Sequence, residues 1–342
     1  MSATAAKPVG VALSGEHLAV LLADRKLAGL LDGAGFAFAV AGVDRIDGSS
    51  PAGRTVESTI AAAVLAARAP RLGWLAAAAV HRDHPYNLAR RIASADHLAG
   101  GRSGLVLGLA DGYAPAGRDA DGAWGGAGLT PGVPLGVQTA RDAAATIRDL
   151  WLSWPYASIV ADRATGVYAR GEQIVHIDHR GAFAVDGPLT VPTTPQGSPV
   201  LAWYARSAAE AAAAAGVADI LIAPARTAAT AAALAAAGPV RPASAGQPAA
   251  APRLFLEIPA GDAGLPGYLG DVRVAGVLVR PPGDERALRE FLRSIPASLR
   301  GAGDPGGSPD RTGTLRERLS LPAPRPLPAG LRPAFPAPVP LR

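Results

Sequence analysis

The strongest constraint on the fold is a regular alternation of short apolar segments with longer segments of helical periodicity. Eight apolar segments of four to nine residues are separated mostly by amphipathic stretches. This alternation is typical of a parallel sheet covered by helices. Eight such strands predict an α/β fold, the closed (β/α)8 TIM barrel, and an open doubly wound sheet is the alternative. The predicted strands are residues 9–13, 36–41, 72–80, 105–109, 199–203, 219–222, 253–258 and 274–279.

Residues 1–300 are predicted to form this barrel domain. Residues 110–198 read as an insertion after the fourth strand, which contains a helix over 140–153 and a β-hairpin over 174–185, and which we expect to cover the site. Residues 301–342 are rich in Pro and Gly and are expected to form a tail without a core. The other predicted helices are 17–34, 56–69, 87–99, 208–215, 227–237 and 285–299, and 238–252 is predicted to be a linker.

Composition excludes several function classes. The chain has no cysteine, so disulfides, thiolate nucleophiles and cysteine-ligated metals are excluded. It has no apolar run of about 18 residues and no secretion signal at its start, so we expect a cytoplasmic protein without a membrane partner. The net charge is +5, but +3 of it lies in 301–342 and no basic stripe carries aromatic residues, so we expect no nucleic-acid partner.

A cluster of polar side chains follows the third predicted strand. The loop contains His81, His84 and Tyr86, together with an arginine and an aspartate. Catalytic groups of such barrels lie at the carboxyl ends of strands, so these three are our candidate catalytic residues. The alternative is a polar loop that only begins the next helix. Loop spacing does not place both imidazoles on one helix face and no further ligand is evident, so we predict no metal site.

Several short motifs then follow one another in a specific order. Residues 84–102 read HPYNLARRIASADHLAGGR, 150–154 read LWLSW, 177–183 read IDHRGAF, 195–200 read PQGSPV and 313–319 read GTLRERL. In this order they resemble the luciferase-like monooxygenases, in the branch that oxidises nitrilotriacetate, EDTA, dibenzothiophene sulfone and pristinamycin precursors. The resemblance extends from about residue 36 to residue 321 and implies the barrel fold independently of the periodicity.

The resemblance also implies a reaction. Members of this family use FMN that a separate flavin reductase has reduced, react it with O2, and transfer one oxygen atom to a small organic substrate. The implied partners are therefore the substrate, O2 and the reductase, and the chain is expected to be a homodimer or a heterodimer with a paralogue. The protein's own task would be to hold the flavin, exclude water and position the substrate.

The family's phosphate-binding turn is only partly retained. Its Gln-Ala-Gly-Ser-Ser sequence corresponds to residues 203–207, in which Ser207 alone is kept. Such a turn holds phosphate at the amino end of a helix. The resemblance makes Tyr204, Arg206 and Ser207 candidate cofactor residues, because a guanidinium can hold phosphate in a bidentate manner. Arg206 as a solvated charge at a helix start is the alternative.

The positions that would contact the flavin ring are also changed. After the fourth strand the family's polar residues are replaced by 105–110, which leaves Gly108 for close approach of a ring and Asp111 as a nearby polar group. Gly42 lies near the place of a family aspartate. These changes keep two alternatives open beside FMN-dependent oxygenation: use of a deazaflavin, and a barrel that binds flavin poorly and acts as a non-catalytic subunit or binding protein.

Overall fold

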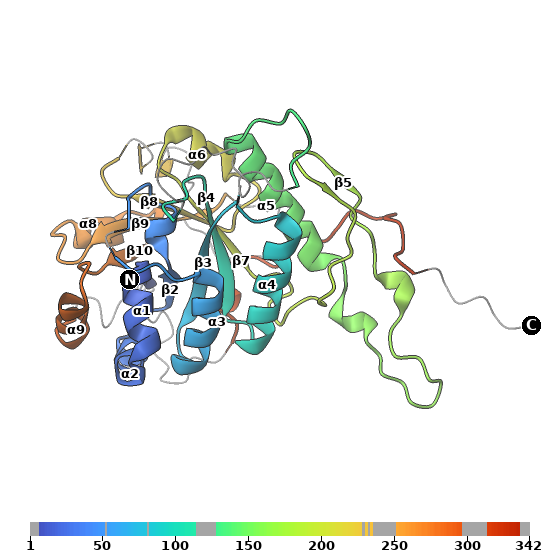
Figure 1. Cartoon of the computed structure of the whole chain (residues 1–342), viewed down its shortest axis with the longest axis horizontal. Coiled ribbons are helices and arrows are strands. Elements are labelled where there is room, and N and C mark those ends of the chain that lie inside the picture. The colour runs from blue at the N-terminus through green and yellow to red at the C-terminus, as the bar shows by residue number, and fades with distance from the viewer. Residues whose placement is uncertain are drawn as a thin grey trace, which may run out of the picture.

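The structure is a computed structural model that describes residues 7–51, 53–80, 82–113, 128–227, 230–231, 233–234, 251–295 and 313–335. Eight parallel strands close into a barrel in the order β1-β10-β9-β8-β7-β4-β3-β2 (Figure 1). The predicted barrel is confirmed and the open sheet is wrong. The strands are β1 Val9–Leu13, β2 Phe38–Ala41, β3 Gly73–Ala79, β4 Ser103–Gly108, β7 Val200–Tyr204, β8 Ile220–Pro224, β9 Arg253–Pro259 and β10 Val274–Arg280.

Helices surround this barrel, as the periodicity predicts, with one difference near the amino terminus. The single helix expected over 17–34 is two helices, because the Asp24 side chain accepts hydrogen bonds from the backbone of Lys26 and Leu27 and begins a new helix. The helices are α1 Gly15–Ala23, α2 Arg25–Gly33, α3 Ser58–Arg68, α4 Pro85–Leu98, α5 Val137–Leu152, α6 Ala208–Ala213, α8 Leu265–Gly270, α9 Glu285–Arg293 and α11 Leu315–Arg318. Among the described residues, none forms a helix both long and apolar enough to span a bilayer.

The segment expected to cover the site instead contributes helix α5 to the barrel wall. Helix α5 lies between α4 and α6, and its buried Ile147, Leu150 and Trp151 pack into the core. The residues after α5 form an arm (155–186) that projects from the barrel (Figure 1) and includes the short hairpin of β5 His179–Arg180 and β6 Ala184–Val185. Within residues 128–198, helix α5 is therefore part of the barrel wall, and the arm over 155–186 projects from it.

Residues 313–321 of the carboxy-terminal segment are not a tail without a core. Helix α11 packs at the amino end of the barrel, where the Leu315 side chain is fully buried against Gly73. Leu319 and Leu321 join the same interior cluster. The expectation for 301–342 is therefore wrong for residues 313–321, because a few apolar residues suffice to cover the barrel end when the barrel supplies the rest of the core.

Candidate active site

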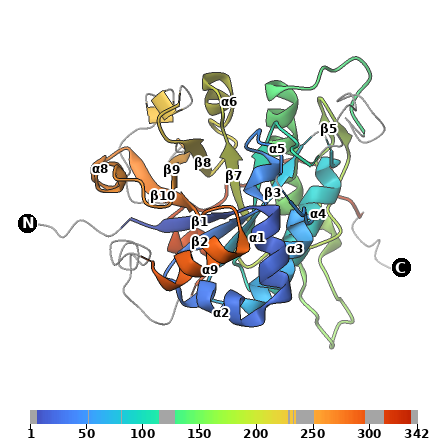
Figure 2. The same cartoon turned by 60° about the vertical axis from the view of Figure 1, so that its left-hand side comes forward.

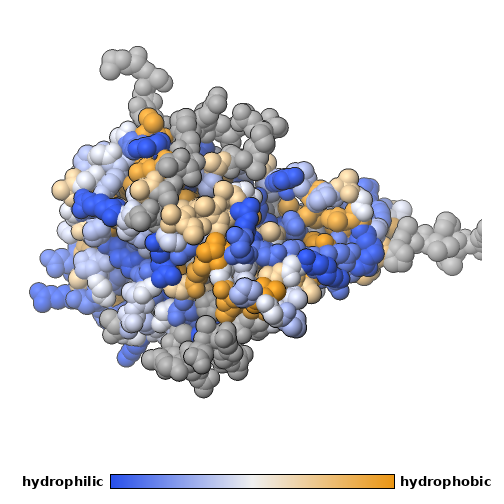
Figure 3. Space-filling model, turned by 90° about the horizontal axis from the view of Figure 1, so that it is seen from above, coloured by the Kyte–Doolittle hydropathy of each residue, from blue (hydrophilic) through white to orange (hydrophobic). Residues whose placement is uncertain are grey.

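The carboxyl ends of the strands form the barrel mouth, where enzymes of this fold hold their substrates. Here residues 42–49, which we call the mouth loop, lie across it. The loop contains the short helix η1, Val43–Arg45, and the fully buried Ile46. Val43 and Ile46 pack with the residues of the barrel interior. Figure 3 views this face and shows hydrophilic and apolar residues interleaved over it.

Ile46 occupies the space that Gly108 leaves open. A Cβ added at Gly108 would lie 2.6 Å from the Ile46 Cβ. The glycine therefore accommodates a side chain of the same protein, in the position where the sequence suggested a flavin ring. Gly42 has a left-handed backbone (φ 77°), and a Cβ there would lie 2.1 Å from the Ser58 hydroxyl. Gly42 thus allows the chain to turn tightly from β2 into the mouth loop.

Asp44 attaches the mouth loop to two neighbouring segments. Its Oδ1 accepts a hydrogen bond from the backbone N–H of Gly15 at 2.9 Å and another from the Tyr113 hydroxyl at 2.9 Å. Burial raises the pKa of Asp44 above its usual value. The loop is also tied to the segment after β4, because the Gly112 N–H donates to the Arg45 carbonyl at 2.6 Å.

A chain of polar side chains crosses the mouth from β7 to the loop. The Tyr204 hydroxyl donates to Glu257 at the end of β9, and Arg280 at the end of β10 donates to the same carboxylate. Arg280 Nη1 donates to Asp47 Oδ2 at 2.7 Å. Burial, and then the negative charge of Glu257, raise the pKa of Tyr204. Tyr204 therefore faces a carboxylate within the barrel.

Asp111 belongs to a second polar network over β2, β3 and β4. The Asp111 carboxylate lies 2.6 Å from Arg82 Nε and 3.3 Å from Arg45 Nε. The Asp111 side chain is nearly buried, so its ion pairs with Arg82 and Arg45 both lie in a region of low effective dielectric constant. Three cations and three anions thus join the mouth loop to α3 and α4. The network consists of Arg45, Arg82, Arg91, Glu57, Asp83 and Asp111.

The turn expected to bind phosphate already holds an acidic group. Glu210, whose side chain is 8% exposed, accepts a hydrogen bond from the Arg206 N–H at 3.0 Å and lies 3.8 Å from the Arg206 guanidinium. Ser207 caps α6 by accepting from the Glu210 N–H at 3.3 Å. The groups expected to attract a phosphate are therefore engaged by a carboxylate of the same chain.

The candidate catalytic residues lie at the start of α4. His84 is the N-cap and its Nδ1 accepts from the Tyr86 N–H at 3.2 Å. The imidazole meets the Phe183 ring edge-on, with centroids 5.8 Å apart, and burial lowers the pKa of His84. The Tyr86 hydroxyl donates to the Pro188 carbonyl at 3.3 Å. Both side chains contact the segment after α5, and His81 lies outside the described residues.

Four residues that fill the mouth are not among the predicted site residues. Glu257 and Arg280 lie near the ends of apolar strands. A charged residue in such a strand is rarely buried unless it is paired, so the two charges could have indicated a polar network at the mouth. Asp47 carried no signal of its own. Glu210 stands three residues after Ser207, which is the spacing of a helix capping box and predicts an internal partner for the turn.

These observations test whether the residues present fit a flavin held as the family resemblance implies. Gly108 is covered by Ile46, Tyr204 and Asp111 are bound to other side chains, and the phosphate turn faces Glu210. An isoalloxazine ring and a phosphate do not fit this arrangement. In the described part of the chain, no three potential metal-ligating side chains come together as a metal site.

Comparison with known proteins identifies the family. A sequence profile described as luciferase-like monooxygenase matches residues 9–260. One of the subunits of pristinamycin IIA synthase from Streptomyces pristinaespiralis is 31% identical over 271 residues, which cover 78% of each chain. Dibenzothiophene-sulfone monooxygenase of Rhodococcus erythropolis is 32% identical over 43% of this chain, and this match spans 31% of that enzyme.

Solved structures agree with the fold. EDTA monooxygenase from Chelativorans sp. BNC1 superposes with a TM-score of 0.68 over 93% of this chain and 99% of that one, at 17% identity. Named relatives include monooxygenases, the enzyme class that the motifs imply. The chain belongs to the luciferase-like monooxygenase family.

Proposed function

We propose that this chain is a subunit of a luciferase-like monooxygenase and that a second, paralogous chain carries the reduced flavin. The observation that carries the proposal is the Glu210 carboxylate, which engages the turn where the flavin phosphate would bind. A phosphate placed there would lie close to the negative charge of Glu210. Two like charges about 4 Å apart near a protein surface repel each other by about 4 kcal/mol, at an effective dielectric constant of about 20.

The match to a protein named as a synthase subunit supports this proposal. The match covers 78% of both chains, so the likeness extends over most of the barrel. The family generally uses reduced flavin. Another relative is named nitrilotriacetate monooxygenase component A, of Aminobacter aminovorans, which implies that a flavin reductase supplies the flavin. In our proposal the reductase supplies reduced flavin to the flavin-carrying chain, and O2 and a small organic substrate react on that chain.

The second candidate is that this chain itself binds reduced FMN and oxygenates the substrate. The family profile over 9–260 favours it, since it includes the mouth loop and the turn at 203–207. In that case the mouth loop would have to move, Arg206 and Ser207 would hold the phosphate, and His81, His84 and Tyr86 would be the candidate catalytic residues. A deazaflavin in place of FMN belongs to the same candidate, and it would need the same opening of the mouth.

Co-purification tests the proposal. The tagged chain is expressed together with each luciferase-like monooxygenase chain of its own organism, and the complexes are analysed for subunit ratio and bound flavin. We expect one such chain to co-purify in a fixed ratio and to bring all of the flavin-binding capacity. The control is that partner purified alone, which should bind reduced FMN. Flavin bound by the tagged chain on its own would contradict the proposal.

A further inference from the structure

The mouth loop is held in place mainly by its side chains. In the described part of the chain, the Arg45 carbonyl is the one backbone group between Val43 and Ser49 that hydrogen bonds to the backbone of another segment. The remaining backbone hydrogen bonds of this stretch lie within the loop itself, where they form η1. A segment without a strand ladder to its neighbours can open while the rest of the barrel stays folded.

Glycines with a left-handed backbone stand near both ends of the loop. Gly42 has φ 77° and Gly48 has φ 85°. Glycine adopts this conformation without the steric cost that a Cβ brings, so the chain can change direction at each position. A Cβ at Gly48 would also lie 2.3 Å from Arg206 Nη1, so the guanidinium packs on the loop backbone. The loop therefore has a hinge at each end, and Arg206 lies over the second hinge.

Ile46 and Asp47 together occupy the mouth as a bound organic acid would. The Ile46 side chain is fully buried beside Gly108. The side chain of the next residue, Asp47, is 7% exposed, and its Oδ2 accepts a hydrogen bond from Arg280 Nη1 at 2.7 Å. An apolar group joined to a carboxylate therefore fills the place where barrels of this fold bind small molecules.

Arg280 keeps a second carboxylate when Asp47 leaves. Its Nε donates to Glu257, whose side chain is 4% exposed. The two residues lie on the neighbouring strands β10 and β9, which stand beside β8 and β7 in the barrel (Figures 1 and 2). Opening of the loop would leave Arg280 and Glu257 as a neutral pair, so no buried charge loses its compensation. The Arg280 Nη1 would then be free to hold the carboxylate of a ligand.

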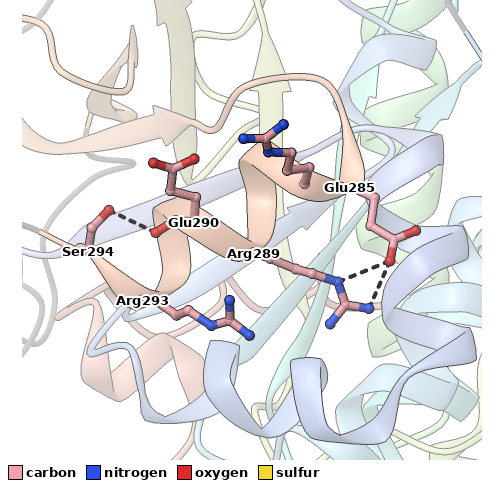
Figure 4. Close-up of a pocket in the computed structure, with 6 residues that line it drawn as sticks. Glu285, Arg289, Glu290, Arg293 and Ser294 are labelled. Atoms are coloured by element: carbon pink, nitrogen blue, oxygen red, sulfur yellow. Dashed lines mark hydrogen bonds and ion pairs between the residues drawn. The ribbon is translucent and has the colours of Figure 1, made fainter.

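The hollow beside α9 has a different character. Figure 4 shows that glutamates and arginines of α9 line it, and Arg289 Nη2 is bound to Glu285 at 2.8 Å. All of its lining residues are polar or charged. A site for a small organic molecule usually combines an apolar lining with a few polar groups, and the mouth has that combination.

We propose that the mouth loop is an autoinhibitory gate over a binding site for a small carboxylic acid with an apolar body. In the closed gate, Ile46 and Asp47 occupy the site. In the open gate, the apolar body of the ligand takes the place of Ile46 beside Gly108, and its carboxylate takes the place of Asp47 on Arg280. Binding requires the open gate, so the apparent affinity falls with the fraction of open molecules. The inference concerns binding by this chain alone and does not rest on the proposed function.

Calorimetric titration of the full-length chain with benzoate tests the proposal. For the wild-type chain we expect a Kd above about 1 mM, because the gate is closed. Asp47→Ala releases the loop and frees Arg280, so it should tighten benzoate binding at least about tenfold. The matched control is Asp262→Ala, which removes a buried aspartate 2.9 Å from Arg226 just after β9 and should change the Kd by less than about threefold. Circular dichroism checks that each variant is folded.

Neutral benzamide separates the contribution of the carboxylate from that of the ring. Its shape is close to that of benzoate, but it has no negative charge to place on Arg280. Benzamide should therefore bind Asp47→Ala less than about threefold more tightly than it binds the wild-type chain.

Hydrogen exchange of the wild-type chain gives an independent result that needs no variant. The amides of 43–49 should exchange at least about tenfold faster than those of β1 and β10, since the gate opens without unfolding of the barrel. Benzoate at about 50 mM should speed the exchange of the loop amides at least about threefold over the same concentration of chloride, because benzoate binds the open gate.

Opposite results would overturn the proposal. An unchanged benzoate Kd in Asp47→Ala, or the same gain in Asp262→Ala, would mean that release of the loop opens no site. An equal gain for benzamide would mean that Arg280 does not hold the carboxylate. Loop amides that exchange no faster in benzoate than in chloride would mean that the loop is a fixed part of the barrel.

Discussion

Replacing Arg316 should destabilise the barrel from its amino end. Its guanidinium lies 2.8 Å from Asp219 Oδ2 and 3.1 Å from Oδ1, with both side chains 6% exposed. It also donates to the Ser198 carbonyl at 3.1 and 3.2 Å and to the Pro322 carbonyl at 2.9 Å. Removing one partner of a buried pair costs about 3–5 kcal/mol, because the remaining charge is left without compensation.

The expected change in melting temperature follows from chain length. At about 2.1 cal/mol/K per residue, the unfolding entropy of this chain is roughly 0.7 kcal/mol/K. Arg316→Ala should therefore lower the Tm by about 4–7 °C. Calorimetry and urea unfolding measure this directly. The control is Arg318→Ala two residues later, a partly exposed side chain, which should cost less than about 1 kcal/mol.

A double-mutant cycle separates the pair from the rest of the packing. If Arg316 acts through Asp219, the double variant Arg316→Ala with Asp219→Asn should be more stable than the sum of the two single effects predicts, by at least about 1 kcal/mol. Equal losses in Arg316→Ala and Arg318→Ala, or additive losses in the cycle, would refute the argument that the carboxy-terminal segment is part of the barrel.

Three further outcomes follow from the core and the mouth. Gly108→Ala should cost about 1–3 kcal/mol in urea unfolding, because the new Cβ would lie 2.6 Å from the Ile46 Cβ. Ile46→Ala should then cost less in the Gly108→Ala chain than it costs in the wild-type chain. Burial raises the pKa of Asp96 to about 6 from 3.8, so the native state binds this proton more tightly than the unfolded chain. The protonated Asp96 therefore stabilises the native state by about 3 kcal/mol below pH 4, and this contribution is lost as the pH rises through 6. Asp96→Asn should abolish the resulting difference in the free energy of unfolding between pH 4.5 and pH 7, as measured by urea unfolding. His17 is held neutral by burial, which lowers its pKa, so His17→Gln should remove a loss of stability that wild type shows as the pH falls below 6.5.

The barrel was predictable because buried parallel strands are short apolar runs, and the structure places all eight within a few residues of the expected positions. Residues 313–321 were misjudged for a physical reason. Their Pro- and Gly-rich surroundings suggest disorder, whereas the burial of Leu315 and Arg316 depends on partners more than 90 residues away.

The mouth was harder to predict for the same reason. Tyr204 and Arg206 were chosen because they correspond to the family's phosphate-binding turn, and that correspondence does not show which group each side chain meets. Glu257 is 53 residues from Tyr204 in sequence, and Asp47 is 233 residues from Arg280. Only the closed barrel brings these charges together, so a sequence suggests the location of the mouth and the fold determines whether it is filled.

Binding of reduced FMN to the purified chain tests most directly whether the mouth is filled by the protein's own side chains. The measurement is an anaerobic titration followed by calorimetry, and we expect no saturable binding below about 100 μM. Saturable binding below that concentration, weakened at least about tenfold by Arg206→Ala but unchanged by Arg318→Ala, would show that the turn holds a phosphate and that the mouth can accept the flavin.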